Sequence, residues 1–175
     1  YSESNYFLLK FAKKIMIKKV IKIILVLALV ALVAIQFIRP EKNNGGYENV
    51  ALFETETKPS AKVAAILKEN CYDCHSDQTQ YPWYAEVAPF SLWLDDHIEH
   101  GKKHFNVSTW NDYSIKKKEH KLEELIEMVE DDEMPLKSYT IIHGNLSEDD
   151  KKILLQWAGV ARLQYKHQLE VSSNK

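Results

Sequence analysis

The sequence predicts an all-α protein, in which one helical domain follows an N-terminal membrane anchor. Several segments place apolar residues three and four positions apart, which is the spacing of one helix face. Before them, Ile23 to Ile38 is a run of sixteen uncharged residues. With 45% hydrophobic residues and only 5 Gly and 5 Pro among 175, the composition is neither that of a disordered chain nor that of a fibrous one.

Residues 1–39 have the features of a signal anchor. Lysines precede the uncharged run, and Arg39 follows it. Counted from Val20, with the Lys22 side chain reaching toward the headgroups, the run has nineteen residues, enough to span a bilayer. The small residues that a signal peptidase needs are missing, which favours an uncleaved anchor over a secretory leader. We expect Met16, the first methionine, to be the natural start.

The charges on either side of this run predict its orientation. Six lysines lie before it, whereas Arg39 and Lys42 lie just after it. By the positive-inside rule, we expect a single-pass protein of the inner (cytoplasmic) membrane, with its domain on the periplasmic, extracytoplasmic side. Sixteen of the 23 Lys/Arg and 24 of the 25 Asp/Glu follow residue 39, a formal charge of −8. We expect no nucleic-acid partner for this acidic part.

The rest of the chain divides into a tether, a domain and a tail. Residues 40–58 contain Asn-Asn-Gly-Gly and acidic residues, which predicts a flexible tether. We place the domain at residues 59–166 and expect residues 167–175 to be frayed. Ser60 is the predicted N-cap of a first helix. The apolar stripe of that helix is Val63, Ala64, Ile66 and Leu67.

A Cys71-Tyr72-Asp73-Cys74-His75 run follows this stripe, and the chain has no other cysteine. C-x-x-C-H is the attachment signature of c-type haem. Two thiols three positions apart can each add to one vinyl group of the porphyrin, and the histidine that follows is then placed as the proximal iron ligand. The single run predicts one covalent haem, bound through Cys71 and Cys74, with its iron on His75.

Three other uses of the two cysteines are open to the sequence. A zinc site would need two more Cys or His ligands nearby, and no second pair is present. A thioredoxin-like dithiol would need a βαβ context, whereas the surroundings of Cys71 read as helical. A disulfide is possible in an oxidising compartment.

An aromatic segment follows the motif and includes Trp83, Tyr84 and Trp93. Flat rings suit a porphyrin face, and a Trp or Tyr donor can reach a propionate. We assign these three residues to the haem pocket, with plain core packing as the alternative.

Met134 is the predicted distal iron ligand. It precedes Pro135, which excludes helical geometry at Met134 and stiffens the loop. The alternative is that Met134 fills core space. Other candidates for the sixth ligand are histidines. They are His97, His100 and His104, on one face of a helix predicted from Phe90 to Phe105, and His143.

Two further helices complete the predicted domain. Lys116 to Glu130 is amphipathic, with Leu and Ile inward and Lys and Glu outward. Leu146 to Gln164 begins with Ser147 and Asp150, which resemble a capping box.

These residues together resemble a known family, the small exported bacterial haem-binding domains related to class I cytochromes c. The resemblance extends from about Pro59 to Arg162, and where the family has His-Pro this chain has His143-Gly144. It implies a cytochrome c-like helical haem fold and His/Met ligation, but no reaction. The residues that carry it are Cys71-Tyr72-Asp73-Cys74-His75-Ser76, Tyr81-Pro82-Trp83-Tyr84, Pro89, Trp93, His97, Gly101, Ser108, Trp110, Met134-Pro135, Tyr139, His143, Leu146-Ser147 and Trp157.

The function predicted from these features is one-electron transfer by a membrane-anchored monohaem protein, rather than catalysis. Redox proteins are the expected partners. The acidic run Glu130 to Glu133, just before Met134, favours partners with a basic docking patch, although it could serve solubility alone. A haem-based redox or gas sensor, a small peroxidase and a structural haem subunit of a respiratory complex are the alternatives.

Overall fold

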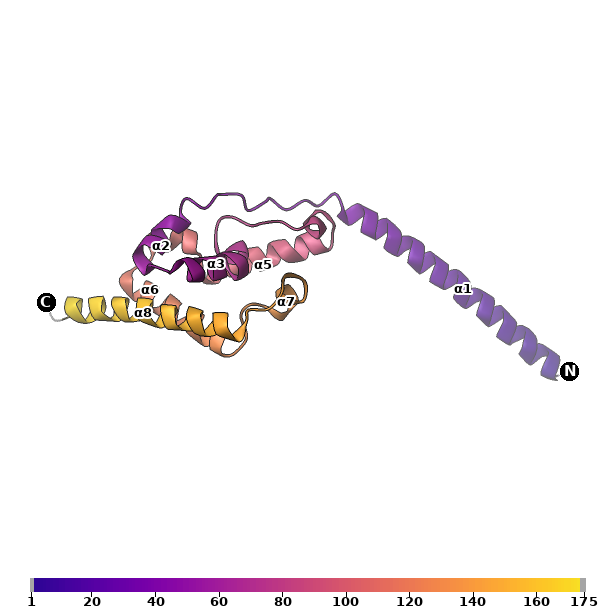
Figure 1. The fold of residues 1–175 in the computed structure, drawn as a ribbon. Helices are drawn as coiled ribbons and strands as arrows, with labels where there is room; N and C mark the ends of the chain where they lie inside the picture. The colour runs from indigo at the N-terminus through magenta and orange to yellow at the C-terminus, as the bar shows by residue number, and fades with distance from the viewer. Residues whose placement is uncertain (1, 174–175) are drawn as a thin grey trace. The chain divides into compact units, whose positions relative to one another are not determined.

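The computed structural model describes residues 2–173, apart from the side chains of residues 2–5, 8, 9 and 12. These residues form helices joined by loops, and none of them lies in a β-strand, so the predicted all-α class is confirmed. Figure 1 labels the α-helices other than α4. The α-helices are α1 (Ser2–Ile35), α2 (Val50–Thr57), α3 (Ala61–Asn70), α4 (Tyr72–His75), α5 (Phe90–His104), α6 (Ile115–Glu130), α7 (Lys137–His143) and α8 (Glu148–Ser173), and the 3-10 helices are η1 (Trp83–Glu86) and η2 (Val107–Asp112).

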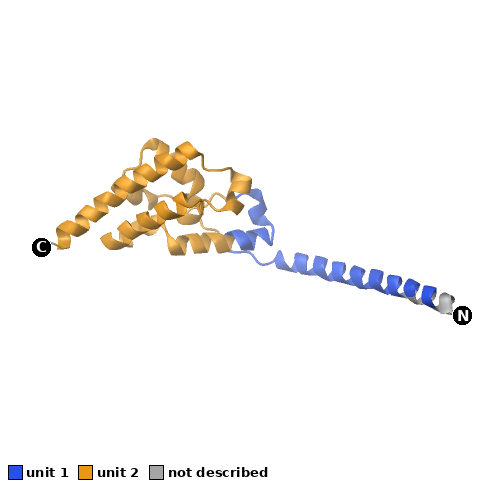
Figure 2. Cartoon of the chain, turned by 90° about the horizontal axis from the view of Figure 1, so that it is seen from below, with its two compact units in different colours: residues 1–40, 82–94 blue, residues 41–81, 95–175 orange. Residues whose placement is uncertain are grey.

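The chain forms two compact units, which Figure 2 colours separately. Unit 1 combines residues 1–40 with residues 82–94, and unit 2 combines residues 41–81 with residues 95–175. Helix α5 therefore begins in unit 1 and ends in unit 2. Each unit is described by itself below.

Unit 1 is held together at the end of α1 by polar contacts. The Gln36 side chain donates from Nε2 to the Ala88 carbonyl oxygen (2.9 Å) and accepts from the Ala88 N–H through Oε1 (3.0 Å). Arg39 pairs with the Glu86 carboxylate at 3.3 Å. The loop around Ala88 is thus bonded to the residues that directly follow α1.

The predicted membrane anchor is not confirmed. Within residues 2–173, no helix combines the length and the apolar character needed to cross a membrane.

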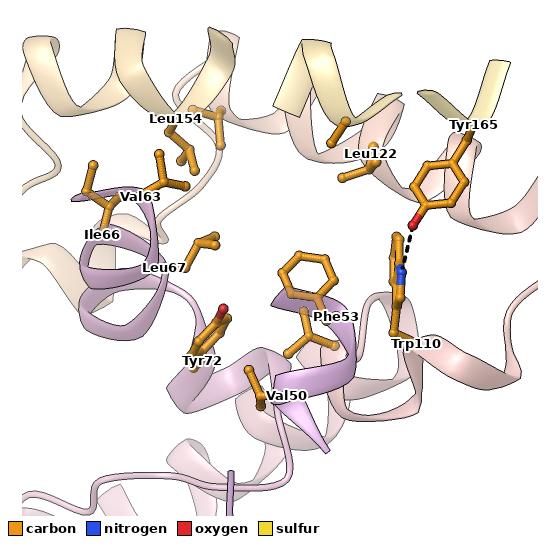
Figure 3. Packing of buried hydrophobic residues seen from close by; sticks show 13 residues of the cluster. Val50, Phe53, Val63, Ile66, Leu67, Tyr72, Trp110, Leu122, Leu154 and Tyr165 are labelled. Carbon is orange, nitrogen blue, oxygen red and sulfur yellow. Dashed lines mark hydrogen bonds between the residues drawn. The ribbon is translucent and has the colours of Figure 1, made fainter. Parts of the chain in front are cut away.

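The core of unit 2 surrounds Phe53, whose side chain is completely buried (Figure 3). Its ring makes edge-to-face contacts with Trp110, Phe105 and Trp157, at centroid distances of 5.0 to 6.3 Å. Such pairs are favourable beyond their buried area. The buried members of this core cluster are Val50, Phe53, Val63, Ile66, Leu67, Tyr72, Val107, Trp110, Leu122, Val129, Leu154, Ala161 and Tyr165.

Helices α6 and α8 pack along each other in unit 2 (Figure 1). The pair buries Leu122 of α6 and Leu154 of α8 in the core, and Arg162 of α8 pairs with Glu119 and Glu123 of α6. Both helices were predicted from apolar periodicity.

Residues 40–58 differ from the flexible tether that we predicted. Residues 50–57 form α2, which buries Val50, Phe53 and Thr57 in the core. These residues have the i, i+3, i+7 spacing of one helix face, which the acidic and Gly-rich composition obscured. Earlier in this segment, the Gly45 N–H donates to the Asp77 carbonyl oxygen (2.6 Å). Most of the predicted tether therefore belongs to the folded unit.

The predicted frayed tail also differs from the structure. Helix α8 continues to Ser173, so residues 167–173 are helical, and residues 174 and 175 lie outside the described residues. Tyr165, two residues before this stretch, is buried against Trp110, which anchors the last part of this helix.

Candidate functional site

The C-x-x-C-H motif forms the junction between α3 and α4. Ser60 caps α3 as predicted, its Oγ accepting from the Val63 N–H. The Cys71 N–H donates to the Leu67 carbonyl oxygen (2.9 Å), and the His75 N–H donates to the Cys71 carbonyl oxygen (2.9 Å). Both cysteines are half-buried free thiols. The motif thus presents two unjoined thiols and the His75 imidazole on one compact turn.

Both thiols are protonated at neutral pH. Burial, and secondarily Cys74, raises the pKa of Cys71 to about 12, and burial with Asp73 raises the pKa of Cys74 to about 11. A redox-active dithiol needs thiolate character, which these raised pKa values oppose. In addition, the described residues contain no group of three or more Cys, His, Asp or Glu placed to hold a metal ion. The site therefore favours neither alternative.

The His75 ring is held by two backbone carbonyl groups. Its Nδ1 lies 2.8 Å from the Phe105 oxygen and 3.0 Å from the Gly101 oxygen. A carbonyl oxygen can only accept, so Nδ1 carries the proton and Nε2 carries the lone pair. Burial lowers the pKa of His75 despite these bonds, which favours the neutral ring. This is the tautomer and orientation that an iron ligand requires.

Gly101 allows α5 to approach the motif closely enough for these bonds. A Cβ atom at Gly101 would lie 2.5 Å from the Cys74 carbonyl oxygen and 3.1 Å from Cys74 Cβ. The nearest atom belongs to the backbone, so the clash could not be relieved by the rotation of a flexible side chain. Gly101 is therefore the residue that lets α5 supply its carbonyl group to His75.

The loop after His75 is fixed by polar contacts that the sequence did not reveal. Asp77 pairs with Lys102 (2.8 Å), its Oδ1 accepts from Asn106 Nδ2 (3.1 Å), and its N–H donates to Ser108 Oγ (2.9 Å). The hydrogen bonds and Lys102 lower the pKa of Asp77 against the opposing effect of burial. Lys102 and Asn106 flank the Gly101 and Phe105 carbonyl groups in sequence, so the same stretch holds both His75 and this loop.

Met134 lies in the turn after α6. Its N–H donates to the Met128 carbonyl oxygen (3.0 Å), and its half-buried side chain packs against the same core cluster as Cys71. These contacts match the core-filling alternative and leave the sixth-ligand role a prediction.

The histidines proposed as alternative ligands have different surroundings. His97 is half-buried, whereas His100 and His104 are exposed, and His100 lies 3.4 Å from the Asp96 carboxylate. His143 is exposed and stacks on Tyr139, with the ring centroids 4.3 Å apart.

The three predicted pocket aromatics belong to unit 1, whereas the cysteines belong to unit 2. Trp83 is 82% exposed, Tyr84 is half-buried and Trp93 is exposed. Within unit 1, Tyr84 makes edge-to-face contacts with Trp83 (6.0 Å) and Phe90 (6.4 Å). The contact of these residues with a haem stays a prediction.

The donor set of unit 2 fits a covalently bound haem. It offers two protonated thiols in C-x-x-C spacing and an adjoining imidazole whose Nε2 lone pair is set by two carbonyl groups. Among known proteins, a family model described as a haem-binding domain matches residues 30–159, about three quarters of the chain. No curated protein and no solved structure matches.

Proposed function

Since the chain belongs to this haem-binding domain family, we propose that it holds one haem through thioether bonds from Cys71 and Cys74, with His75 as the proximal iron ligand. The observation that carries the proposal is the pair of hydrogen bonds from His75 Nδ1, which leaves the Nε2 lone pair available for an iron in the residue that follows Cys74. In each attachment, the S–H bond adds across one vinyl double bond, so no atom is lost.

Covalent attachment is tested by extraction. Haem is expected to stay with the polypeptide through acid-acetone treatment of the purified protein. The control is the double variant Cys71→Ser/Cys74→Ser, which keeps His75 and is expected to release all its haem. Complete release from the wild type would overturn the thioether proposal while leaving haem binding itself intact.

We propose one-electron transfer as the function, because a bound haem supplies an iron that alternates between its ferric and ferrous forms. In this role the chain's own residues bind the cofactor and set its potential. His75 is a neutral donor, and we propose Met134 as the second axial ligand. A His/Met pair raises the reduction potential of the iron.

Met134→Ala is expected to abolish the far-red sulfur-to-iron absorption band of the ferric protein. Met128, the methionine of α6, provides the control, because Met128→Leu conserves its volume and should keep the band. If the band survives in Met134→Ala, another residue must be the sixth ligand, and the half-buried His97 is the first candidate.

We further propose that residues 1–39 attach the protein to a membrane, with unit 2 on the extracytoplasmic side where covalent haem attachment takes place. Support comes from the exposed apolar side chains of α1, such as Leu25, Leu27 and Leu29, which follow a lysine-rich stretch. Fractionation of cells and the mass of the native protein test this, and a soluble product cut near Ile35 would contradict it.

Redox proteins with a basic patch are the partners we propose, because residues 40–175 carry a formal charge of −8. All four residues of the acidic run Glu130 to Glu133 are exposed, and Asp132 among them pairs with Lys151. Electron exchange between the wild-type protein and a cationic mediator should slow as salt rises. In a variant with residues 130–133 changed to Asn and Gln, the same rise in salt should slow the exchange less.

A further inference from the structure

The Tyr139 side chain of α7 bonds to the backbone that carries the C-x-x-C-H motif. Its hydroxyl donates to the Glu69 carbonyl oxygen at 2.9 Å and lies 3.4 Å from Asp73 Oδ2. Glu69 is in the last turn of α3, and Asp73 stands between the two cysteines. The hydroxyl thus contacts residues on both sides of Cys71.

The surroundings of Tyr139 keep its hydroxyl a neutral donor. Burial first, and then Asp73 and Cys74, raise the pKa of Tyr139. The His143 ring lies almost parallel to the Tyr139 ring, at an interplanar angle of 14°. The hydroxyl therefore keeps its proton for the bond to Glu69 at any physiological pH.

Helix α7 is linked to Met134 by a short turn. Leu136 is the N-cap of α7 and accepts the Tyr139 N–H (2.9 Å). At its other end, this turn is fixed to α6 by the bond from the Met134 N–H to Met128. Pro135 restricts the backbone between these two ends. The position of α7 therefore determines where the turn can place the Met134 side chain.

We propose that Tyr139 is a positioning residue that ties α7 to the cysteine motif and so holds the Met134 turn where its thioether can bind the haem iron. This inference rests on the proposed haem function and on Met134 as a ligand. Tyr139 does not bind the iron itself. Without its hydroxyl, α7 moves more freely, and external ligands compete better with Met134.

The test compares Tyr139→Phe with Tyr81→Phe in the full-length protein with its haem. Both changes remove one phenol hydroxyl from unit 2, but that of Tyr81 accepts from the Asn43 N–H (2.7 Å), away from α7. Imidazole is titrated into the ferric protein, and loss of the sulfur-to-iron band is followed. One hydrogen bond corresponds to about a fivefold change in an equilibrium constant, so Tyr139→Phe should need about fivefold less imidazole.

Amide hydrogen exchange supplies a second readout, which does not depend on the iron. The amides of residues 137–143 should exchange about fivefold faster in Tyr139→Phe. Both readouts should stay at the wild-type level in Tyr81→Phe.

Each other outcome overturns the inference in a recognisable way. Equal imidazole affinity in wild type and Tyr139→Phe, with the band present in both, overturns the positioning role alone. Equal effects of the two substitutions indicate general loosening and also overturn it. Absence of the sulfur-to-iron band from the wild type would show that Met134 is not a ligand, and it would therefore also overturn the positioning role of Tyr139. Covalent haem attachment would not be affected by this result, because the extraction experiment tests it separately.

Discussion

Gly101→Ala is expected to destabilise the protein by about 1–3 kcal/mol and to reduce its content of attached haem, because the new methyl group overpacks a backbone contact. The added Cβ would lie 2.5 Å from the Cys74 carbonyl oxygen, so α5 or α4 must shift. Either shift lengthens the bond from His75 Nδ1 to the Gly101 carbonyl group. Denaturant unfolding measures the first effect, and absorbance of haem per polypeptide measures the second.

Gly159→Ala is the matched control, since Gly159 also lies within a helix and a Cβ there would meet nothing within 4 Å. Alanine should stabilise that position by about 0.5–1 kcal/mol, because glycine loses more backbone entropy on folding. Two alanine substitutions in helices should therefore act in opposite directions. Equal stability changes in the two variants would show that α5 does not approach the motif this closely.

Glu56→Gln is expected to cost about 2–3 kcal/mol of folding free energy. Glu56 accepts hydrogen bonds from Lys118 Nζ (2.7 Å), the Tyr165 hydroxyl (2.8 Å) and Trp110 Nε1 (3.2 Å). Figure 3 shows the Trp110 and Tyr165 side chains that meet at this network. Removing the carboxylate charge leaves Lys118 buried without its counter-ion, which costs about 3–5 kcal/mol at fully buried sites. We expect less here because the Glu56 side chain is 36% exposed.

The same network makes stability depend on acid. Burial raises the pKa of Glu56, but the hydrogen bonds from Lys118 and Tyr165 outweigh burial, and the net pKa is lowered. A lowered folded-state pKa stabilises the protein above the unfolded value of about 4.5, and this contribution is lost as the pH falls through the folded value. The stability gap between wild type and Glu56→Gln should therefore narrow below about pH 4.5.

Urea unfolding at several pH values measures this gap. Glu127→Gln, at an exposed position of α6, is the control and should change stability by less than about 0.5 kcal/mol. A gap between wild type and Glu56→Gln that stays constant down to pH 3 would contradict the assignment of the acid dependence to Glu56.

Long amphipathic segments were predictable from the sequence because their apolar period is a local property. The helix expected from Lys116 to Glu130 is α6, which begins at Ile115, and the one expected from Phe90 to Phe105 is α5, which ends at His104. The short helices α2, η2 and α7 were missed. A segment of six to eight residues shows too little periodicity, and its stability comes from distant partners, as when Phe53 packs on Trp110.

The candidate site was predictable only for those residues that are close neighbours in the sequence. Cys71, Cys74 and His75 stand together in the chain, so their spacing alone made them candidates. The partners of His75 lie 26 and 30 residues away and act through carbonyl groups, which every residue has. The close approach of α5 to the motif left one local sign in the sequence, which is a glycine, Gly101, within an otherwise helical segment. No sequence pattern indicated that Tyr139 bonds to the backbone of Glu69.

The two bonds between Gln36 and Ala88 decide where the protein can be cut for study. An expression fragment that starts after residue 40 would leave both backbone groups of Ala88 without the side-chain amide that satisfies them. A fragment that starts at residue 59 would also lack Phe53 and Glu56, and with them the centre of the core and the counter-ion of Lys118. Recombinant material that is meant to keep its native fold should therefore retain the residues from Gln36 onward.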